Sequence, residues 1–180
     1  MDRANGNTNT MTDRPLVINE PEAMHFQVHR STLVDPRILE LEQRRIFDVC
    51  WIYVGHESEV RAPGDFRTRT LCGRPVILCR DSQNNVRVFL NTCRHRGTVV
   101  CREPEGNATY YVCFYHGWTY DRDGNLDRVP GQSAYPPSFS KSDFGLKEPP
   151  RVAAYRGFVF LNFDRDAMPL EVSAAPMATM

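Results

Sequence analysis

Two short segments of the sequence hold cysteine and histidine at spacings that suit metal binding. One residue separates Cys93 from His95, two residues separate Cys113 from His116, and positions 96–112 lie between the two pairs. Each pair can direct two side chains from one tight loop toward a common centre. Thiolate and imidazole ligands suit iron in iron–sulfur centres and also zinc. The spacing therefore predicts a metal centre held by two loops.

Two kinds of centre use two cysteines and two histidines. Structural zinc sites usually place both cysteines together and both histidines together. Here each pair is mixed, which suits one thiolate and one imidazole from each loop, shared between the two irons of a Rieske-type [2Fe–2S] cluster. Gly97 and Gly117 follow the pairs and allow the backbone to approach such a cluster closely. The pattern favours the cluster, with structural zinc and four unconnected core residues as alternatives.

Short strands are expected to position these loops. From Trp51 onward, runs rich in β-branched and aromatic residues alternate with turn residues, a pattern typical of an antiparallel β domain. Asp123-Gly124 indicates a hairpin turn. The predicted strands are Arg74–Arg80, Val86–Thr92, Thr109–Tyr115, Trp118–Tyr120, Leu126–Val129 and Arg156–Phe163, with a long loop over residues 130–150.

A helix is predicted before the strands, over Asp35–Val49. Asp35 suits the N-cap and Pro36 the first helical position. Leu39, Ile46 and Cys50 would share the apolar face of this helix. The cysteines outside the two pairs are expected to be small core residues: Cys50, Cys72, Cys79 and Cys101.

Charge and hydropathy exclude several classes of function. Lys+Arg and Asp+Glu are both 22, so a net charge of zero removes the main argument for nucleic-acid binding. The longest apolar runs, such as Phe158–Phe163, are too short to cross a bilayer, and the N-terminus lacks the apolar core of a secretory signal. We therefore expect a cytoplasmic globular protein, and in a reducing compartment paired cysteines favour metal binding over disulfides.

The residues around both pairs resemble a known family. CRHRG and CFYHGWTYDRDGNL are similar to the Rieske motif of the α (large) subunits of aromatic ring-hydroxylating dioxygenases, and GFVFLNFD resembles the strand that closes their Rieske domain. The resemblance implies a mainly β fold. The expected architecture is a Rieske-type antiparallel β-sandwich with two cluster-binding hairpin loops, preceded by an N-terminal α-helix.

The resemblance also implies roles for individual residues. Cys93 and Cys113 would bind the buried iron as thiolates, and His95 and His116 would bind the outer iron near the surface. Residues beside these ligands would tune the cluster through hydrogen bonds or shielding: Arg96, Gly97, Tyr115, Gly117 and Trp118. No catalytic residue is expected in this chain.

Four regions are expected along the chain: a mobile tail over 1–14, a helical segment over 15–50, the Rieske domain over 51–165 and a truncated C-terminal extension over 166–180. Relatives continue into a catalytic domain that holds mononuclear Fe(II) through two histidines and one carboxylate. We expect that domain to be missing from these 180 residues, so that the chain alone only transfers electrons.

The resemblance implies a place in an oxygenase. Electrons would pass from a ferredoxin or reductase to the cluster and then to the mononuclear iron, where an aromatic ring is oxidised with O2. An α-subunit trimer and a β subunit are further implied partners. A free-standing Rieske ferredoxin is the alternative, and a structural zinc module is a third interpretation.

Overall fold

The computed structural model describes residues 15–173, and the chain divides into two compact units, Met1–Gln43 and Arg44–Met180. The predicted mobile tail over 1–14 lies outside the described residues, as does 174–180 of the predicted C-terminal extension. Across the described range, no helix is long and apolar enough to cross a membrane.

The first unit contains a β-hairpin followed by two short helices. β1 (Val17–Glu20) pairs antiparallel with β2 (His25–Val28) across the 3-10 turn Pro21–Ala23, and α1 (Ser31–Val34) and α2 (Pro36–Glu42) follow. No residue in 15–43 is buried. The prediction of a helical segment over 15–50 was wrong for its first half, because β1 and β2 form a hairpin there. β1 (VINE) lacks the alternation of apolar and polar residues that reveals a strand in a sequence, and β2 (HFQV) shows it over four residues only.

The predicted helix is present, although one expectation about its surroundings was wrong. The Asp35 side chain accepts a hydrogen bond from the Arg37 amide at 2.9 Å, and Pro36 occupies the first turn. The helix continues as a π-helical turn, Gln43–Phe47, and ends there. Cys50 lies beyond this end and is exposed, so it is not a core residue.

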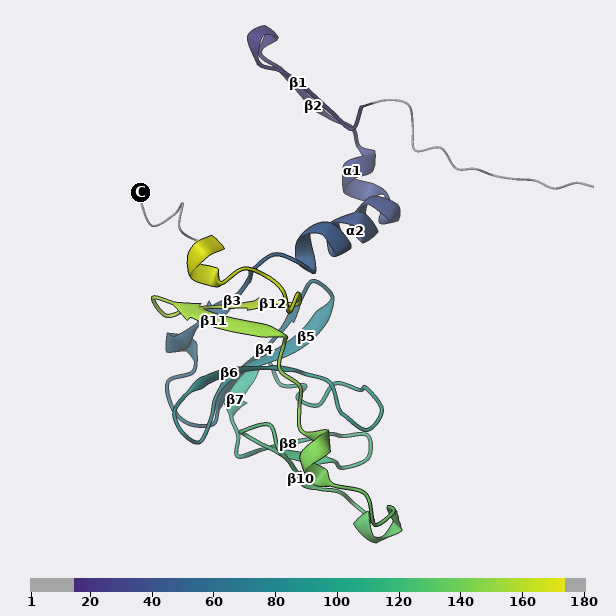
Figure 1. Ribbon diagram of the computed structural model, residues 1–180, viewed down its shortest axis with the longest axis vertical. Helices are drawn as coiled ribbons and strands as arrows, with labels where there is room; N and C mark the ends of the chain where they lie inside the picture. Colours follow the sequence, from purple (N-terminus) through teal and green to yellow (C-terminus); the bar gives the residue numbers. More distant parts are fainter. Residues whose placement is uncertain (1–14, 174–180) are drawn as a thin grey trace, which may run out of the picture. The chain divides into compact units, whose positions relative to one another are not determined.

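The second unit contains three antiparallel sheets (Figure 1). Their strand orders are β11-β12-β3, β6-β5-β4-β7 and β10-β9-β8. The strands are β3 (Ile52–His56), β4 (Asp65–Leu71), β5 (Arg74–Arg80), β6 (Val86–Leu90), β7 (Glu105–Asn107), β8 (Tyr110–Val112), β9 (Thr119–Asp121), β10 (Leu126–Arg128), β11 (Arg151–Tyr155) and β12 (Phe158–Asn162). Short 3-10 helices cover Glu57–Glu59, Gln132–Ala134 and Lys141–Phe144.

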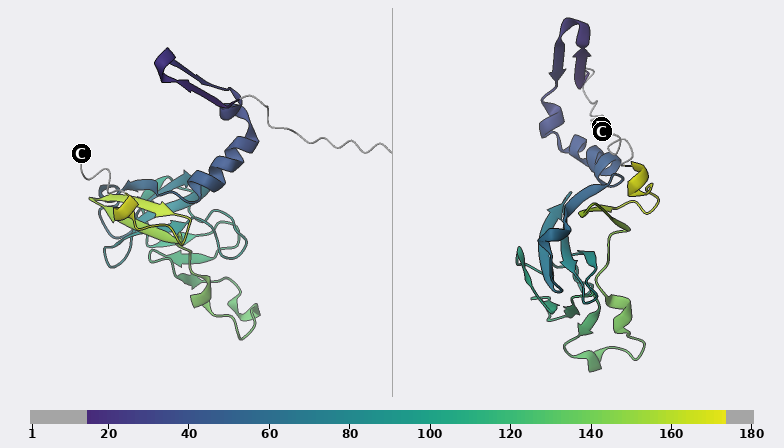
Figure 2. Two further views of the ribbon diagram at one scale, coloured as in Figure 1. Left: turned by 45° about the horizontal axis from the view of Figure 1, so that its top comes forward. Right: turned by 90° about the vertical axis from the view of Figure 1, so that its left-hand side faces the viewer.

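The four-stranded sheet is the middle layer of this unit, as the strand labels in Figure 1 show, and Figure 2 gives two further views of the same sheets. Alternate residues of β5 face opposite cores because strand side chains alternate between faces. Val76 and Leu78 pack with Val159 of β12, whereas Ile77 and Cys79 pack with the aromatic residues that lie beneath the two Cys/His loops. A strand buried on both faces must be apolar throughout, which explains the run VILC in this segment.

Most predicted strands are present, and β5 has the predicted bounds Arg74–Arg80. The last one differs: Arg156 and Gly157, with φ of 50° and 83°, form the turn between β11 and β12 rather than the start of a strand. The predicted loop over 130–150 contains only 3-10 helical turns. The antiparallel β-sandwich with a preceding helix is confirmed.

Candidate metal centre

The first Cys/His loop follows β6 and folds back on itself. The Cys93 amide donates to the carbonyl of Thr98 at 2.7 Å, and the Gly97 amide donates to the carbonyl of Cys93 at 2.9 Å. Gly97 has φ of +76°, a conformation that residues with a Cβ avoid. These two bonds make a compact loop from which the side chains of Cys93 and His95 project.

The second loop connects β8 to β9 and has the same backbone pattern. The Cys113 amide donates to the carbonyl of Trp118 at 2.8 Å, and the Gly117 amide donates to the carbonyl of Cys113 at 2.9 Å. Gly117 has φ of +70°. Cysteine and the fifth residue, glycine, therefore have equivalent positions in both loops.

The two loops bring the four predicted ligands together. Cys93 and Cys113 are free thiols with only 3% and 1% of their surfaces exposed. Burial raises the pKa of Cys113, the neighbouring Cys93 thiol adds to this rise, and the amides of Tyr115 and His116 oppose it. The imidazole rings of His95 and His116 lie 4.7 Å apart between centroids. Two sulfurs thus lie inside, with two imidazoles beside one another at the end of the site.

The two imidazoles have different surroundings. The His95 ring stacks on the buried Trp118 indole at 4.9 Å with an interplanar angle of 8°, and its Nδ1 is buried without a hydrogen-bond partner. Burial, together with the electrostatic effect of the neighbouring His116 and Arg96 side chains, lowers the pKa of His95. His116 is exposed, and the exposed Tyr115 ring lies 3.8 Å from it.

The donor set fits a [2Fe–2S] cluster. Such a cluster takes two protein ligands on each iron, and here two buried thiols and two adjacent imidazoles are available, one of them with an orphaned ring nitrogen. A zinc ion would need four donors around one point. Among residues 15–173, no group of three or more His, Cys, Asp or Glu side chains could hold a single ion.

Tyr120 is a part of the site that the sequence analysis missed. Its Oη lies 3.3 Å from Cys93 Sγ and accepts a hydrogen bond from the Arg94 amide at 2.9 Å. Burial raises the pKa of Tyr120, so the phenol keeps its proton. Because the Arg94 amide already supplies a hydrogen to the oxygen, the phenolic O–H is free to donate to a Cys93 thiolate. Tyr120 belongs to β9 and so joins the first loop to the strand that follows the second.

The residues expected to tune the site have three kinds of position. Trp118 is buried and also contacts Tyr135, Phe139 and Phe144 in the loop over 130–150. Gly97 and Gly117 hold the left-handed turns. Arg96 and Tyr115 are exposed at the rim. Trp118 therefore covers the His95 ring from inside the domain, and the exposed Tyr115 ring lies against His116 at the rim.

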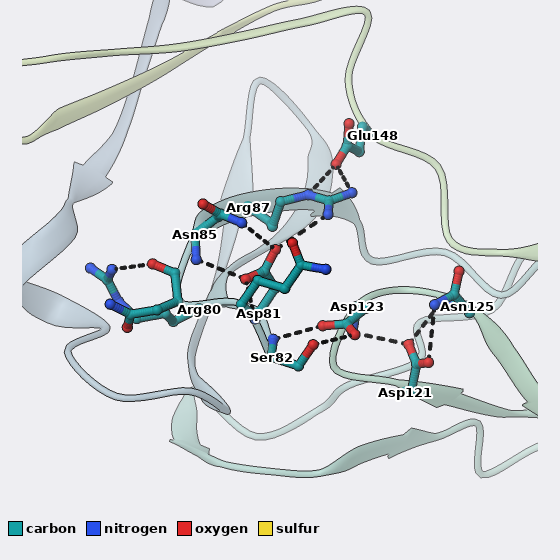
Figure 3. Close-up of polar contacts among 11 residues, drawn as sticks. Arg80, Asp81, Ser82, Asn85, Arg87, Asp121, Asp123, Asn125 and Glu148 are labelled. Atoms are coloured by element: carbon teal, nitrogen blue, oxygen red, sulfur yellow. Dashed lines mark hydrogen bonds and ion pairs between the residues drawn. The ribbon is translucent and has the colours of Figure 1, made fainter.

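The hairpin turns behind the two loops are hydrogen-bonded to each other (Figure 3). In the β5–β6 turn, Asp81 Oδ1 accepts hydrogen bonds from the backbone amides of Gln83 and Asn85. In the β9–β10 turn, Asp121 Oδ1 accepts in the same way from the backbone amides of Asp123 and Asn125. The Asp123 carboxylate then accepts from the amide and hydroxyl of Ser82, at 2.7 Å and 2.6 Å. These bonds fix the middle sheet against the sheet that carries the second loop.

The antiparallel β-sandwich and its two Cys/His loops define the class of this protein: an iron–sulfur protein whose cluster is held by two loops. Comparisons with known proteins identify the family within this class. Residues 50–152, more than half of the chain, match the model of the Rieske [2Fe-2S] domain. The chain therefore belongs to the Rieske [2Fe–2S] domain family, and its cofactor is a Rieske-type [2Fe–2S] cluster.

Several relatives are oxygenase subunits. The chain is 40% identical over 149 residues to the chlorobenzene dioxygenase α subunit of Cupriavidus sp. (strain PS12), covering 79% of this chain and 33% of that subunit. It is 42% identical over 148 residues to the biphenyl 2,3-dioxygenase α subunit of Rhodococcus jostii (strain RHA1), with 79% and 32% covered. The chain thus spans about a third of the length of the curated relatives it matches and is homologous to the N-terminal part of such α subunits.

Solved structures agree with this relationship. Naphthalene 1,2-dioxygenase from Rhodococcus sp., bound to indole, superposes with a TM-score of 0.76 at 40% identity, covering 81% of this chain and 33% of that one. A quaternary ammonium Rieske monooxygenase in its apo form gives a TM-score of 0.74 at 31% identity, with 83% and 43% covered. The fold is therefore shared by dioxygenases and monooxygenases of this family.

Proposed function

We propose that Cys93, His95, Cys113 and His116 bind the Rieske cluster and that this chain is the electron-transfer domain of an oxygenase α subunit. The observation that carries the proposal is the convergence of two buried thiols and two adjacent imidazoles from loops with one backbone pattern. When bound, the cluster supplies a one-electron redox centre whose histidine ligands raise its potential to roughly −150 to +300 mV.

The side chains of the site would divide the work between them. The Cys93 and Cys113 thiolates would hold the inner iron, and the His95 and His116 imidazoles would hold the outer iron, where a partner can approach. Trp118 excludes water from one face of His95, because the two rings stack. Tyr120 would donate a hydrogen bond to the Cys93 sulfur and so stabilise the added negative charge of the reduced state.

The finer role follows from the relatives. We infer that the chain accepts electrons from a ferredoxin or reductase and passes them to a mononuclear iron, as part of a dioxygenase acting on an aromatic ring with O2 in the cytoplasm. Similarity to α subunits covers about four-fifths of this chain, including residues before the Rieske match. This extent supports the oxygenase assignment over a free-standing ferredoxin. Trimerisation and association with a β subunit are part of the same proposal.

The direct test is the metal and acid-labile sulfide content of protein purified anaerobically. We expect about two iron and two sulfide per chain. One zinc without sulfide would overturn the proposal in favour of a structural module. About three iron with two sulfide would reveal a second, mononuclear site and contradict a purely electron-transferring chain.

The histidine ligands need a separate test. His95→Cys and His116→Cys should each keep a [2Fe–2S] cluster but lower its midpoint potential, because thiolate donates more charge to iron than imidazole does. His29→Cys is the matched control, since His29 is exposed and its ring lies within hydrogen-bond distance of Ser31 in the first unit, away from both Cys/His loops in the sequence. A potential that stays unchanged in His95→Cys or His116→Cys would show that the histidine concerned is not a ligand.

A further inference from the structure

The two Cys/His loops are closed at their bases by different means. The second loop connects β8 to β9, which are neighbours in one sheet, and Val112 pairs directly with Thr119 at its base. The first loop leaves β6 and leads toward β7, but these strands are the two outer strands of the four-stranded sheet. Strand pairing therefore cannot close the first loop.

The side chain of Asn91 closes the first loop instead. Asn91 Nδ2 donates to the carbonyl of Cys101 at 2.7 Å, and Asn91 Oδ1 accepts from the amides of Val100 and Cys101 at 3.0 Å and 2.8 Å. One side chain thus makes three backbone hydrogen bonds across the base of the segment that contains both Cys93 and His95. The side chain takes the place of a strand ladder.

Asn91 is itself held rigidly. Only 2% of its surface is exposed. Its backbone amide donates to the carbonyl of Pro75 in β5 at 2.9 Å, and this bond extends the β5–β6 ladder by one residue. Because the backbone of Asn91 is bonded to β5 and its side chain to the first loop, Asn91 fixes the loop relative to the four-stranded sheet. The side-chain amide of Asn91 pairs with buried backbone groups of Val100 and Cys101, and leaving these groups without a hydrogen-bond partner would cost free energy.

We propose that Asn91 is the positioning residue of the metal centre: by clamping Val100 and Cys101, it sets where the first loop presents Cys93 and His95 to the cluster. The inference rests on the proposed ligand set. The hydrogen bonds that the Asn91 side chain makes in the described part of the chain go to the backbone of Val100 and Cys101, so its effect on the cluster passes through the loop backbone.

A matched control exists in the same unit. Asn162 is also fully buried; its Nδ2 donates to the carbonyl of Val49 at 3.0 Å, and its Oδ1 accepts from the Asp164 amide at 2.8 Å. It is the last residue of β12, on the other outer sheet from the metal centre. Asn91→Ser and Asn162→Ser are both neutral changes that shorten a buried amide side chain, so both should lower thermal stability. Only the former should disturb the cluster.

The experiment uses the full chain with its cluster. In Asn91→Ser we expect shifted EPR g-values, a shifted midpoint potential and about five- to tenfold faster loss of iron to a chelator, the factor that corresponds to one buried hydrogen bond. Asn162→Ser should leave all three at wild-type values. If both variants lose thermal stability and neither changes these readouts, Asn91 is a structural residue only and the proposal is wrong.

A second variant covers a failure of folding. Asn91→Gln keeps the amide but is one methylene longer, so it cannot meet Val100 and Cys101 from the same position, and the same shifts are expected. If neither Asn91 variant accumulates as folded protein while Asn162→Ser does, the proposal is overturned, because positioning implies a folded chain with a displaced loop. A wild-type protein without iron and sulfide would instead refute the proposed function itself.

Discussion

The two loops of the metal centre share one backbone course but differ in what surrounds their side chains. Cysteine and glycine have equivalent positions, with matching hydrogen bonds and matching positive φ at Gly97 and Gly117. The histidine is the third residue of the first loop and the fourth of the second. His95 is consequently stacked on Trp118, whereas His116 is exposed. The backbone frame and the imidazole environments are thus specified by different residues.

The sulfurs differ in a related way. Tyr120 reaches Cys93 from a strand outside the first loop, whereas Cys113 is approached by the amides of Tyr115 and His116 within its own loop. Both loops have the same internal backbone bonds, but the first has in addition a tertiary contact between Tyr120 and its cysteine, whereas the second is closed at its base by the β8–β9 ladder. This difference indicates that distant substitutions will affect the first loop more than the second.

The largest effect is expected where the loops should behave alike. Cys93→Ser and Cys113→Ser should each reduce iron from about two per chain to near zero, because a serine hydroxyl is not ionised at neutral pH and both thiolates are needed on one iron. Iron and sulfide analysis measures this. Cys50→Ser, at an exposed position, is the control and should retain full loading. Full loading in one of the two loop variants would break the equivalence.

Replacing the two loop glycines should destabilise the two loops by different amounts, although both substitutions cause the same kind of backbone strain. Both Gly97→Ala and Gly117→Ala force a Cβ into the left-handed region, at a cost of about 1–2 kcal/mol each. An added Cβ at Gly117 would lie 3.0 Å from Pro130 Cγ, whereas Gly97 has nothing within 4 Å. Gly117→Ala should therefore lose more free energy of unfolding, measured by urea denaturation of the loaded protein. Equal losses of free energy of unfolding would mean that Pro130 and the loop over 130–150 move aside for the added Cβ without cost.

Tyr120→Phe should change the potential without removing the cluster. Loss of a hydrogen bond worth about 1 kcal/mol to the reduced state lowers a one-electron potential by about 40 mV. A redox titration followed by circular dichroism measures the shift. Tyr111→Phe is the control, because Tyr111 is buried in the same core and its hydroxyl has no hydrogen-bond partner in the described part of the chain. An unchanged potential in Tyr120→Phe would remove this distinction between the two sulfurs.

The smallest effect concerns the hairpin behind the first loop. Burial alone would raise the pKa of Asp81, but hydrogen bonds from Asn85 and Gln83, together with Arg87, hold it below its ordinary value. A lowered pKa in the folded state stabilises the fold above the unfolded value, about 4, and this contribution disappears as pH falls through the folded pKa.

Asp81→Asn keeps an oxygen that accepts from the Gln83 and Asn85 amides but loses the charge, so it should cost only about 0.5–1 kcal/mol at pH 7 and flatten the acid limb of the stability curve below about pH 4. Thermal unfolding between pH 2.5 and 7 of both proteins tests this. A parallel acid limb in wild type and variant would show that other carboxylates determine it.

The Cys/His centre could be predicted from the sequence because its members are local. Cys93 with His95, and Cys113 with His116, are close along the chain, and the loop glycines follow at once. The prediction that they are the ligands awaits the metal analysis. The strand β5 could also be predicted, since its apolar run matches its burial on both faces.

The missed residues depend on tertiary structure. Asn91 closes a loop only because β6 and β7 are not neighbours, and Tyr120 reaches Cys93 across two segments far apart in sequence. The strand order was not accessible from residue patterns. The error at Cys50 has a different origin, because helical periodicity was extended past Phe47, where the helix ends.

The absence of any buried residue in 15–43 has a consequence for how the protein is made. The first buried side chain along the described chain is Val54, so residues 15–43 leave the ribosome before any residue of the core is available. An isolated two-stranded hairpin is at best marginally stable in water. During synthesis this stretch therefore stays open to proteases until a surface covers it, and limited proteolysis should trim it while sparing the sandwich.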